Sequence, residues 1–185
     1  MSSRPQHHVP VFEAEPPAYT TRRALEYPLA RPDLSGNEAR YVAEAIRDNA
    51  ISSVGRHVGA FESAFARFLD VPHAIAVSSG TAALHLALAA LDIGPGDEVV
   101  IPDLTYVATA NAVRYVGASV VLADVDATSW TIDPTQVERA ITPRTRAIVA
   151  VHLYGNPAAL GVLAGIARRR RVALIEDAAQ ALGAT

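Results

Sequence analysis

Short apolar runs alternate with helical segments through most of this 185-residue chain, and this alternation limits the possible folds more than any other feature. Apolar strands that are each followed by a helix indicate a mostly parallel sheet with both faces covered. We therefore predict an α/β protein with three layers, α/β/α. The expected strands are 73–77, 98–101, 119–123, 147–152 and 172–175, and the expected helices between them are 82–91, 105–116, 134–141 and 159–170.

Two more helices are expected before the first strand. One covers 37–48, where apolar residues recur at helical spacing. The other has an apolar stripe on one face, which we interpret as core: Phe61, Phe65, Phe68 and Leu69. Residues 1–27 are rich in proline and have no periodicity, which is typical of a flexible arm. The predicted organisation is an arm over 1–27 and a domain over 28–185.

Composition excludes several classes of function. Half of the residues are apolar, and the net charge of −3 gives no general attraction to nucleic acid or to a membrane. The absence of cysteine excludes disulfides, thiolate metal sites and cysteine nucleophiles. His7 and His8 have no third ligand nearby, so no metal site is predicted. Without a signal peptide or a membrane-length apolar run, we expect a cytoplasmic protein.

The sequence contains no lysine, so arginine makes up all 16 residues of the combined Lys and Arg count. These residues therefore cannot supply a Schiff base through a lysine amine. Four arginines lie in one run, at 168–171. We interpret that run as the carboxyl end of a helix, where cations complement the dipole, rather than as a nucleic-acid surface.

Three predicted strand ends carry residues suited to binding a ligand. Asp177 follows the last strand, although with Gln180 it also has the form of a helix capping box. The sequence Ser-Ser-Gly-Thr at 78–81 offers free N–H groups and a hydroxyl at a helix start, which suits a phosphate but also an ordinary cap. The glycines of 94–96 precede a strand, so they are not a dinucleotide-binding fingerprint.

Tyr106 lies in the first turn of a helix that Thr105 is expected to cap, where its ring can lean over the same crevice or pack on the sheet edge. His152 ends another strand, and we interpret it as a hydrogen-bonded structural residue. The strand ends together offer a phosphate cradle, an aromatic face and a carboxylate. Pyridoxal phosphate needs all three, because it has a phosphate dianion, a flat ring and a ring nitrogen that a buried Asp keeps protonated.

Six motifs then follow one another along the chain: Ser-Gly-Thr-Ala-Ala-Leu (79–84), Gly-Pro-Gly-Asp-Glu-Val (94–99), Thr-Tyr-Val-Ala-Thr-Ala-Asn (105–111), Ile-Thr-Pro-Arg-Thr-Arg (141–146), Val-His-Leu-Tyr-Gly (151–155) and Ile-Glu-Asp-Ala-Ala-Gln (175–180). In order and spacing they closely resemble the DegT/DnrJ/EryC1/StrS sugar aminotransferases, which are pyridoxal-phosphate enzymes of fold type I. The resemblance runs from about Leu29 to the last residue. Residues 34–41 and 102–106 look most like the perosamine-synthase branch, which aminates C4 of a GDP-linked 4-keto-6-deoxy sugar.

The resemblance implies that Gly80, Thr81 and Ala82 meet the cofactor phosphate. In the family, the Schiff-base lysine and a further phosphate-binding serine follow the last motif by some two dozen residues, which would place both beyond Thr185. No catalytic residue is therefore assigned in this chain, and we expect it to be inactive alone.

The resemblance also implies three contacts to the cofactor ring. Tyr106 would stack on the pyridine ring, Asp177 would pair with the ring nitrogen, and Gln180 would reach the edge that carries the phenolic oxygen. The family often has Trp and then Pro around 50–57, and this chain has neither there.

The implied function is a pyridoxal-phosphate-dependent aminotransferase that takes its amino group from glutamate. It would be a homodimer when complete, with no nucleic-acid or membrane partner. The alternative is a non-catalytic fragment or paralogue that binds a full-length relative or a sugar nucleotide. As a partial fold type I large domain, the chain would lack the strands on both sides of 73–77. We therefore expect low stability and an exposed sheet edge.

Overall fold

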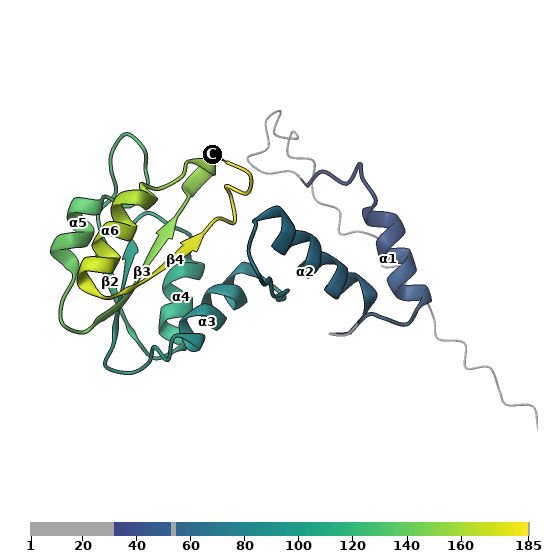
Figure 1. Cartoon of the computed structure of the whole chain (residues 1–185), viewed down its shortest axis with the longest axis horizontal. Coiled ribbons are helices and arrows are strands. Elements are labelled where there is room, and N and C mark those ends of the chain that lie inside the picture. Colours follow the sequence, from purple (N-terminus) through teal and green to yellow (C-terminus); the bar gives the residue numbers. More distant parts are fainter. Residues whose placement is uncertain (1–31, 53–54, 185) are drawn as a thin grey trace, which may run out of the picture. The chain divides into compact units, whose positions relative to one another are not determined.

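The computed structural model describes residues 32–52 and 55–184. The expected arm over 1–27, with His7 and His8, lies outside these residues. The described elements follow in the order α1 (Glu38–Arg47), α2 (Arg56–Phe68), α3 (Gly80–Ala90), β1 (Glu98–Pro102), α4 (Val107–Tyr115), β2 (Ser119–Ala123), α5 (Pro134–Ala140), β3 (Thr145–Val151), the 3-10 turn η1 (Leu153–Gly155), α6 (Leu160–Arg170) and β4 (Ala173–Asp177) (Figure 1). In the described part of the chain, every helix is too short or too polar to cross a membrane.

The four strands form one parallel sheet in the order β2-β1-β3-β4. Successive residues of a strand face opposite sides, so β1 contributes to two separate cores. Val99 packs with Leu88 of α3 on one side, and Val100 packs with Leu163 of α6 on the other. Helices therefore cover both faces (Figure 1), which confirms the predicted three-layer α/β/α fold.

Local sequence explains where several helices begin and end. Asp133 caps α5 by accepting a hydrogen bond from the Thr135 N–H at 2.7 Å, and Pro134 occupies the first position, where its missing N–H costs nothing. Helix α6 ends with three arginines and a left-handed Arg171. Arg169 pairs with Glu138 of α5 at 3.2 Å. The arginine run is thus the carboxyl end of a helix, as predicted.

The expected strand at 73–77 is wrong. The segment has no strand pairing among the described residues, and it lies between α2 and α3. Among the described residues, the segment has one hydrogen bond to a side chain: the Ala76 N–H donates to Glu62 Oε1 at 2.9 Å. Ile75 is 71% exposed. The run is apolar enough for a strand, but no neighbouring backbone in the described sheet offers it hydrogen bonds.

The prediction that the phenylalanine stripe is core is also wrong for most of its members. Helix α2 has no buried residue, and Phe61 and Phe68 are more than half exposed. Phe65 is half-buried, but a cavity of about 580 Å³ separates it and Leu69 from Ile175 of β4. The stripe therefore lines open space instead of packing against the sheet.

The chain divides into two compact units after Ala60, within α2. In the first unit, the Arg56 guanidinium pairs with Glu44 at 2.9 Å and with Asp48 at 3.2 Å. The His57 and Tyr41 rings lie 5.3 Å apart, so α1 and the start of α2 are tied together by charge and ring contacts. The second unit contains the sheet and all the predicted site residues.

Candidate cofactor-binding site

One cavity of about 270 Å³ lies where α3 and α4 begin and where β3 and β4 end. It is lined by Gly80, Thr81, Leu84, Tyr106, Ala108, Val151, His152, Asp177, Ala179 and Gln180. Because the strands are parallel, the segments that follow them reach the same edge of the sheet. The structure thus brings together five of the six residues for which the sequence predicted contact with a cofactor.

The amino end of α3 provides the part of the cavity suited to an anion. The Ser79 side chain caps the helix by accepting a hydrogen bond from the Ala82 N–H at 3.2 Å. The N–H groups of Gly80 and Thr81 lie in the first turn of the helix, where no helical carbonyl can accept a hydrogen bond from them. They are therefore available to a ligand. A Cβ at Gly80 would meet no heavy atom within 4 Å, so the space beside this backbone is open. A phosphate group fits this arrangement.

Ala82 is the sixth predicted residue, and it does not line the cavity. Its N–H is already bonded to Ser79, and its side chain is only partly exposed. The helix was expected from residue 82 but begins at Gly80. The sequence also did not show which N–H the capping serine would use.

Asp177 ends β4 and provides the carboxylate of the cavity. Its Oδ1 accepts a hydrogen bond from the Ala179 N–H at 3.1 Å, and its carbonyl accepts one from the His152 N–H at 3.0 Å. The alternative interpretation, a helix capping box, is wrong because residues 179–183 form turns rather than a helix. The Gln180 side chain bonds to Tyr154 and Tyr106 instead, and Asp177 lines the cavity at the end of β4.

Gln180 connects two segments that are far apart in sequence. Its Oε1 accepts a hydrogen bond from the Tyr154 N–H at 3.0 Å, and its Nε2 donates to the Tyr106 hydroxyl oxygen at 3.2 Å. Tyr106 is the N-cap of α4, so the expected cap at Thr105 is wrong by one residue. The Thr105 hydroxyl instead bonds to the hydroxyl of Thr109 at 2.9 Å. The Tyr106 ring is therefore oriented through its phenol.

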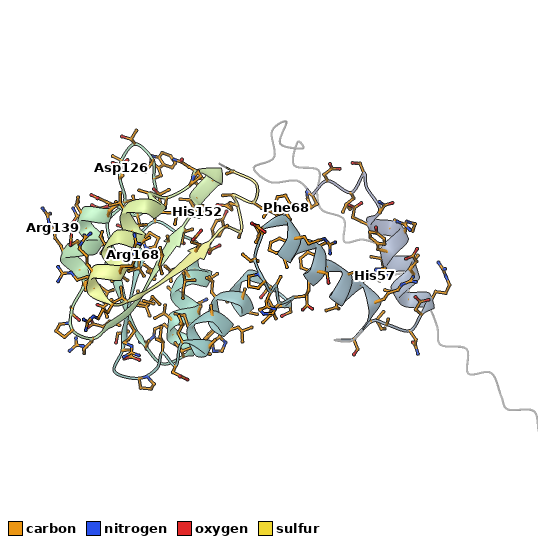
Figure 2. The ribbon with its side chains drawn as sticks, viewed as in Figure 1. His57, Phe68, Asp126, Arg139, His152 and Arg168 are labelled. Carbon is orange, nitrogen blue, oxygen red and sulfur yellow. The ribbon has the colours of Figure 1, made fainter. Side chains whose placement is uncertain are left out.

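His152, which directly follows β3 (Figure 2), lines the same cavity. It is 5% exposed. Its Nδ1 accepts a hydrogen bond from the Ala158 N–H at 3.1 Å, so the ring proton is on Nε2. The predicted structural hydrogen bond is therefore present. Sequence analysis did not predict that the ring would also form part of the cavity wall, although its place at a strand end was a signal for this.

Two aromatic residues near the site were not predicted at all. Tyr154 lies in η1, and its ring is 6.2 Å from that of Trp130, which follows β2 in the chain. A second cavity, of about 140 Å³, is lined by Leu104, Thr105, Tyr106, Leu153 and Tyr154. In residues 32–52 and 55–184, no three His, Asp or Glu side chains come together in a way that could hold a metal ion.

Several known proteins are similar to this chain in sequence or in structure. The GDP-perosamine synthase of Caulobacter vibrioides is 52% identical over 157 residues, which are 85% of this chain and 42% of that protein. The structure of S. venezuelae DesV in complex with a ketimine intermediate has a TM-score of 0.74 and 44% identity, over 80% of this chain and 40% of that one. NtdA from Bacillus subtilis, solved with bound cofactor PMP, has a TM-score of 0.76 and 36% identity, over 80% of this chain and 34% of that one.

This chain spans about two-fifths of the length of the curated relatives it matches. A family model matches residues 32–185, most of the sequence. The chain therefore belongs to the DegT/DnrJ/EryC1/StrS aminotransferase family.

Proposed function

We propose that this chain binds pyridoxal phosphate and its amino form, pyridoxamine phosphate (PMP), in the 270 Å³ cavity. The complete protein would be an aminotransferase that acts on a nucleotide-linked 4-keto-6-deoxy sugar, with glutamate as the amino donor. The observation that supports this most directly is the shared cavity, which combines an open helix start, an aromatic ring and a carboxylate. The similarity to a GDP-perosamine synthase and to a PMP-bound structure supports the same conclusion.

The phosphate would be held at the start of α3. The N–H groups of Gly80 and Thr81 and the Thr81 hydroxyl are donors, and the helix dipole favours a negative charge there. The chain offers no lysine for this phosphate, so backbone donors supply most of the binding.

The ring would lie between the phenol of Tyr106 and the carboxylate of Asp177. A carboxylate next to the pyridine nitrogen favours the protonated form of that nitrogen. The bound cofactor would supply an electron sink for the transfer of an amino group. Tyr106 would present its ring face to the cofactor. Gln180, whose Nε2 donates to the Tyr106 hydroxyl oxygen, would reach the oxygen-bearing edge of the cofactor ring.

Binding of PMP to the purified chain tests this proposal, because PMP needs no Schiff base. Trp130 is the only tryptophan of the sequence and adjoins the site through Tyr154, so its fluorescence should fall as PMP binds. Asp177→Asn should weaken binding about 10- to 150-fold, the equivalent of a hydrogen bond to a charged group.

Asp103→Asn is a matched control, because Asp103 also follows a strand but lines neither of these cavities. It should leave the dissociation constant of PMP unchanged. Equal affinity of the Asp177 variant and the unmodified chain would contradict the proposal.

We also propose that the complete protein is a homodimer. Helix α1 buries no residue, and its Val42 and Ile46 are 59% and 63% exposed. A second copy that covers them would remove this apolar surface from water. Light scattering of the complete protein should give twice the subunit mass, and a monomer at all concentrations would contradict the proposal.

A second candidate function is a non-catalytic chain that binds a sugar nucleotide or a full-length relative. Because the 185 residues contain no lysine, both candidates predict that this chain alone, supplied with pyridoxal phosphate, glutamate and a GDP-linked 4-keto-6-deoxy sugar, forms no amino sugar. Co-purification of this chain with a full-length relative would favour the second candidate, and its absence would count against it.

A further inference from the structure

Trp130 and Tyr154 have an unusual backbone conformation. Six non-glycine residues in the described part of the chain have positive φ. Four of them follow the last turn of a helix, where a left-handed residue is common: Asn49, Asp70, Asp92 and Arg171. The other two are Trp130, with φ 60°, and Tyr154, with φ 53°. Bulky residues rarely adopt this conformation away from helix ends.

The same two residues form a ring pair on the surface. Their rings are 6.2 Å apart and inclined at 66°, in an edge-to-face arrangement. Trp130 is 53% exposed and Tyr154 is 57% exposed. Burial of their own rings is therefore not what stabilises the strained backbone.

Several hydrogen bonds hold this arrangement in place. Asp126 lies in the loop after β2 (Figure 2). The Trp130 N–H donates to the Asp126 carbonyl at 2.8 Å, and Asp126 Oδ1 accepts from Ser129 N–H at 2.8 Å. The Asn156 side chain donates to the Ser129 carbonyl at 2.8 Å, which joins the loop after β2 to the turn η1. Strained residues that are held by many contacts while their side chains remain exposed are found at ligand sites.

The ring pair adjoins the proposed cofactor site. The 140 Å³ cavity is lined by Tyr106 and Tyr154, and Tyr106 also lines the 270 Å³ cavity. A ligand whose reacting group lies over the cofactor could therefore extend past Tyr106 to Tyr154 and Trp130. The exposed aromatic faces at that point suit a second flat ring.

We propose that Trp130 and Tyr154 form a stacking subsite for the nucleobase of the nucleotide-linked substrate. The inference rests on the proposed function, in which the substrate carries its sugar at one end and a base at the other. Stacking on an aromatic ring suits any base, because every base has a flat face. The left-handed backbone and the tie through Asn156 fix the two rings before the base arrives, which reduces the entropy cost of binding.

The test measures GDP binding by equilibrium dialysis with the full 185-residue chain. Tyr154→Asn and Trp130→Asn remove one ring each while keeping a residue that tolerates positive φ. Each should raise the dissociation constant of GDP about 5- to 150-fold. Tyr154→Phe and Trp130→Phe keep a ring and should bind GDP much as the unmodified chain does.

Inorganic pyrophosphate, measured in the same way, separates stacking from phosphate binding. Its affinity should not change in the Asn variants. Tyr115→Leu is the control for loss of an exposed aromatic residue, since Tyr115 is 61% exposed on α4 and pairs with His85 instead. It should leave GDP binding unchanged.

The inference is overturned if the chain does not bind GDP, or if the Asn variants bind it as well as the unmodified chain. It is also overturned if the Phe variants lose as much affinity as the Asn variants, or if pyrophosphate binding falls equally. PMP binding by the unmodified chain distinguishes the two proposals. If Asp177→Asn weakens PMP binding while Tyr154→Asn and Trp130→Asn leave the dissociation constant of GDP unchanged, only the stacking subsite is wrong.

Discussion

Both halves of the Gln180 amide are engaged, and this determines which way the side chain faces. The Tyr154 N–H requires an acceptor, so the oxygen lies toward η1 and the nitrogen donates to Tyr106. One side chain thus connects a strained turn to the ring proposed to stack on the cofactor. The orientation of Tyr106 depends on a residue 74 positions away in the sequence.

Gln180→Leu should therefore destabilise the protein. The change removes the acceptor of the Tyr154 N–H and the donor to Tyr106, and we expect a loss of about 1 kcal/mol in the free energy of unfolding. Urea denaturation would measure it. Gln136→Leu, on α5 and away from the site, is the control. Equal stability of the two variants would show that the Gln180 hydrogen bonds contribute nothing.

Single residues were predicted from sequence to the extent that they follow a recognisable strand end. Asp177 and Tyr106 were found because an apolar run precedes each of them. The pairing of Tyr154 with Trp130 was not found, because it depends on left-handed backbone at two bulky residues. Bulky side chains disfavour that conformation, so no local sequence pattern predicts it.

The start of β1 is joined by an ionic contact to the segment that precedes β3. Glu98, 5% exposed at the start of β1, accepts hydrogen bonds from the Thr142 hydroxyl and from the Arg144 guanidinium, whose Nε is 2.9 Å away. The Thr142 hydroxyl, followed by Arg144, holds the pKa of the Glu98 carboxyl below its ordinary value. The charged form is therefore favoured in the folded protein.

Stability should consequently depend on pH through Glu98. Because the folded pKa is the lower one, the carboxylate stabilises the fold above its ordinary pKa of 4.5, and this contribution is lost as the pH falls through the folded pKa. The free energy of unfolding, measured between about pH 7 and about pH 3, should fall less steeply in Glu98→Gln. Thr142→Val, which removes the main cause, should act in the same direction. Unchanged slopes in both variants would contradict this account.

Strands could be predicted from the sequence where the chain also contains the strands that pair with them. The four strands and the helices between them were located to within a few residues, since each apolar run pairs with another described strand. Residues 73–77 have the same apolar character and form no strand. Strand formation depends on a partner backbone, which a run of apolar residues does not reveal.

At the scale of the whole molecule, apolar side chains are covered unevenly. Leu88 is 1% exposed in the core between α3 and the sheet, whereas Phe68 is 64% exposed. Phe65 and Leu69 line the 580 Å³ cavity beside β4. The sequence could not distinguish these cases, because a helical stripe shows which residues share a face and not whether another element covers it.

The two kinds of apolar residue should respond differently to substitution. Leu88→Ala should cost about 2–5 kcal/mol, because it opens a cavity in a packed core. Phe68→Ser should change the free energy of unfolding by less than about 0.5 kcal/mol, as for an ordinary surface position. Thermal unfolding of both variants would measure the difference. A large loss in the Phe68 variant would show that the stripe is covered after all.

A crystal structure of this chain with PMP would show whether the 270 Å³ cavity binds the cofactor. We expect the phosphate oxygens to lie about 3 Å from the N–H groups of Gly80 and Thr81. The ring should lie against Tyr106, and the pyridine nitrogen should face the carboxylate of Asp177. PMP bound elsewhere, or bound with its ring nitrogen turned away from Asp177, would show that this cavity is not the cofactor site.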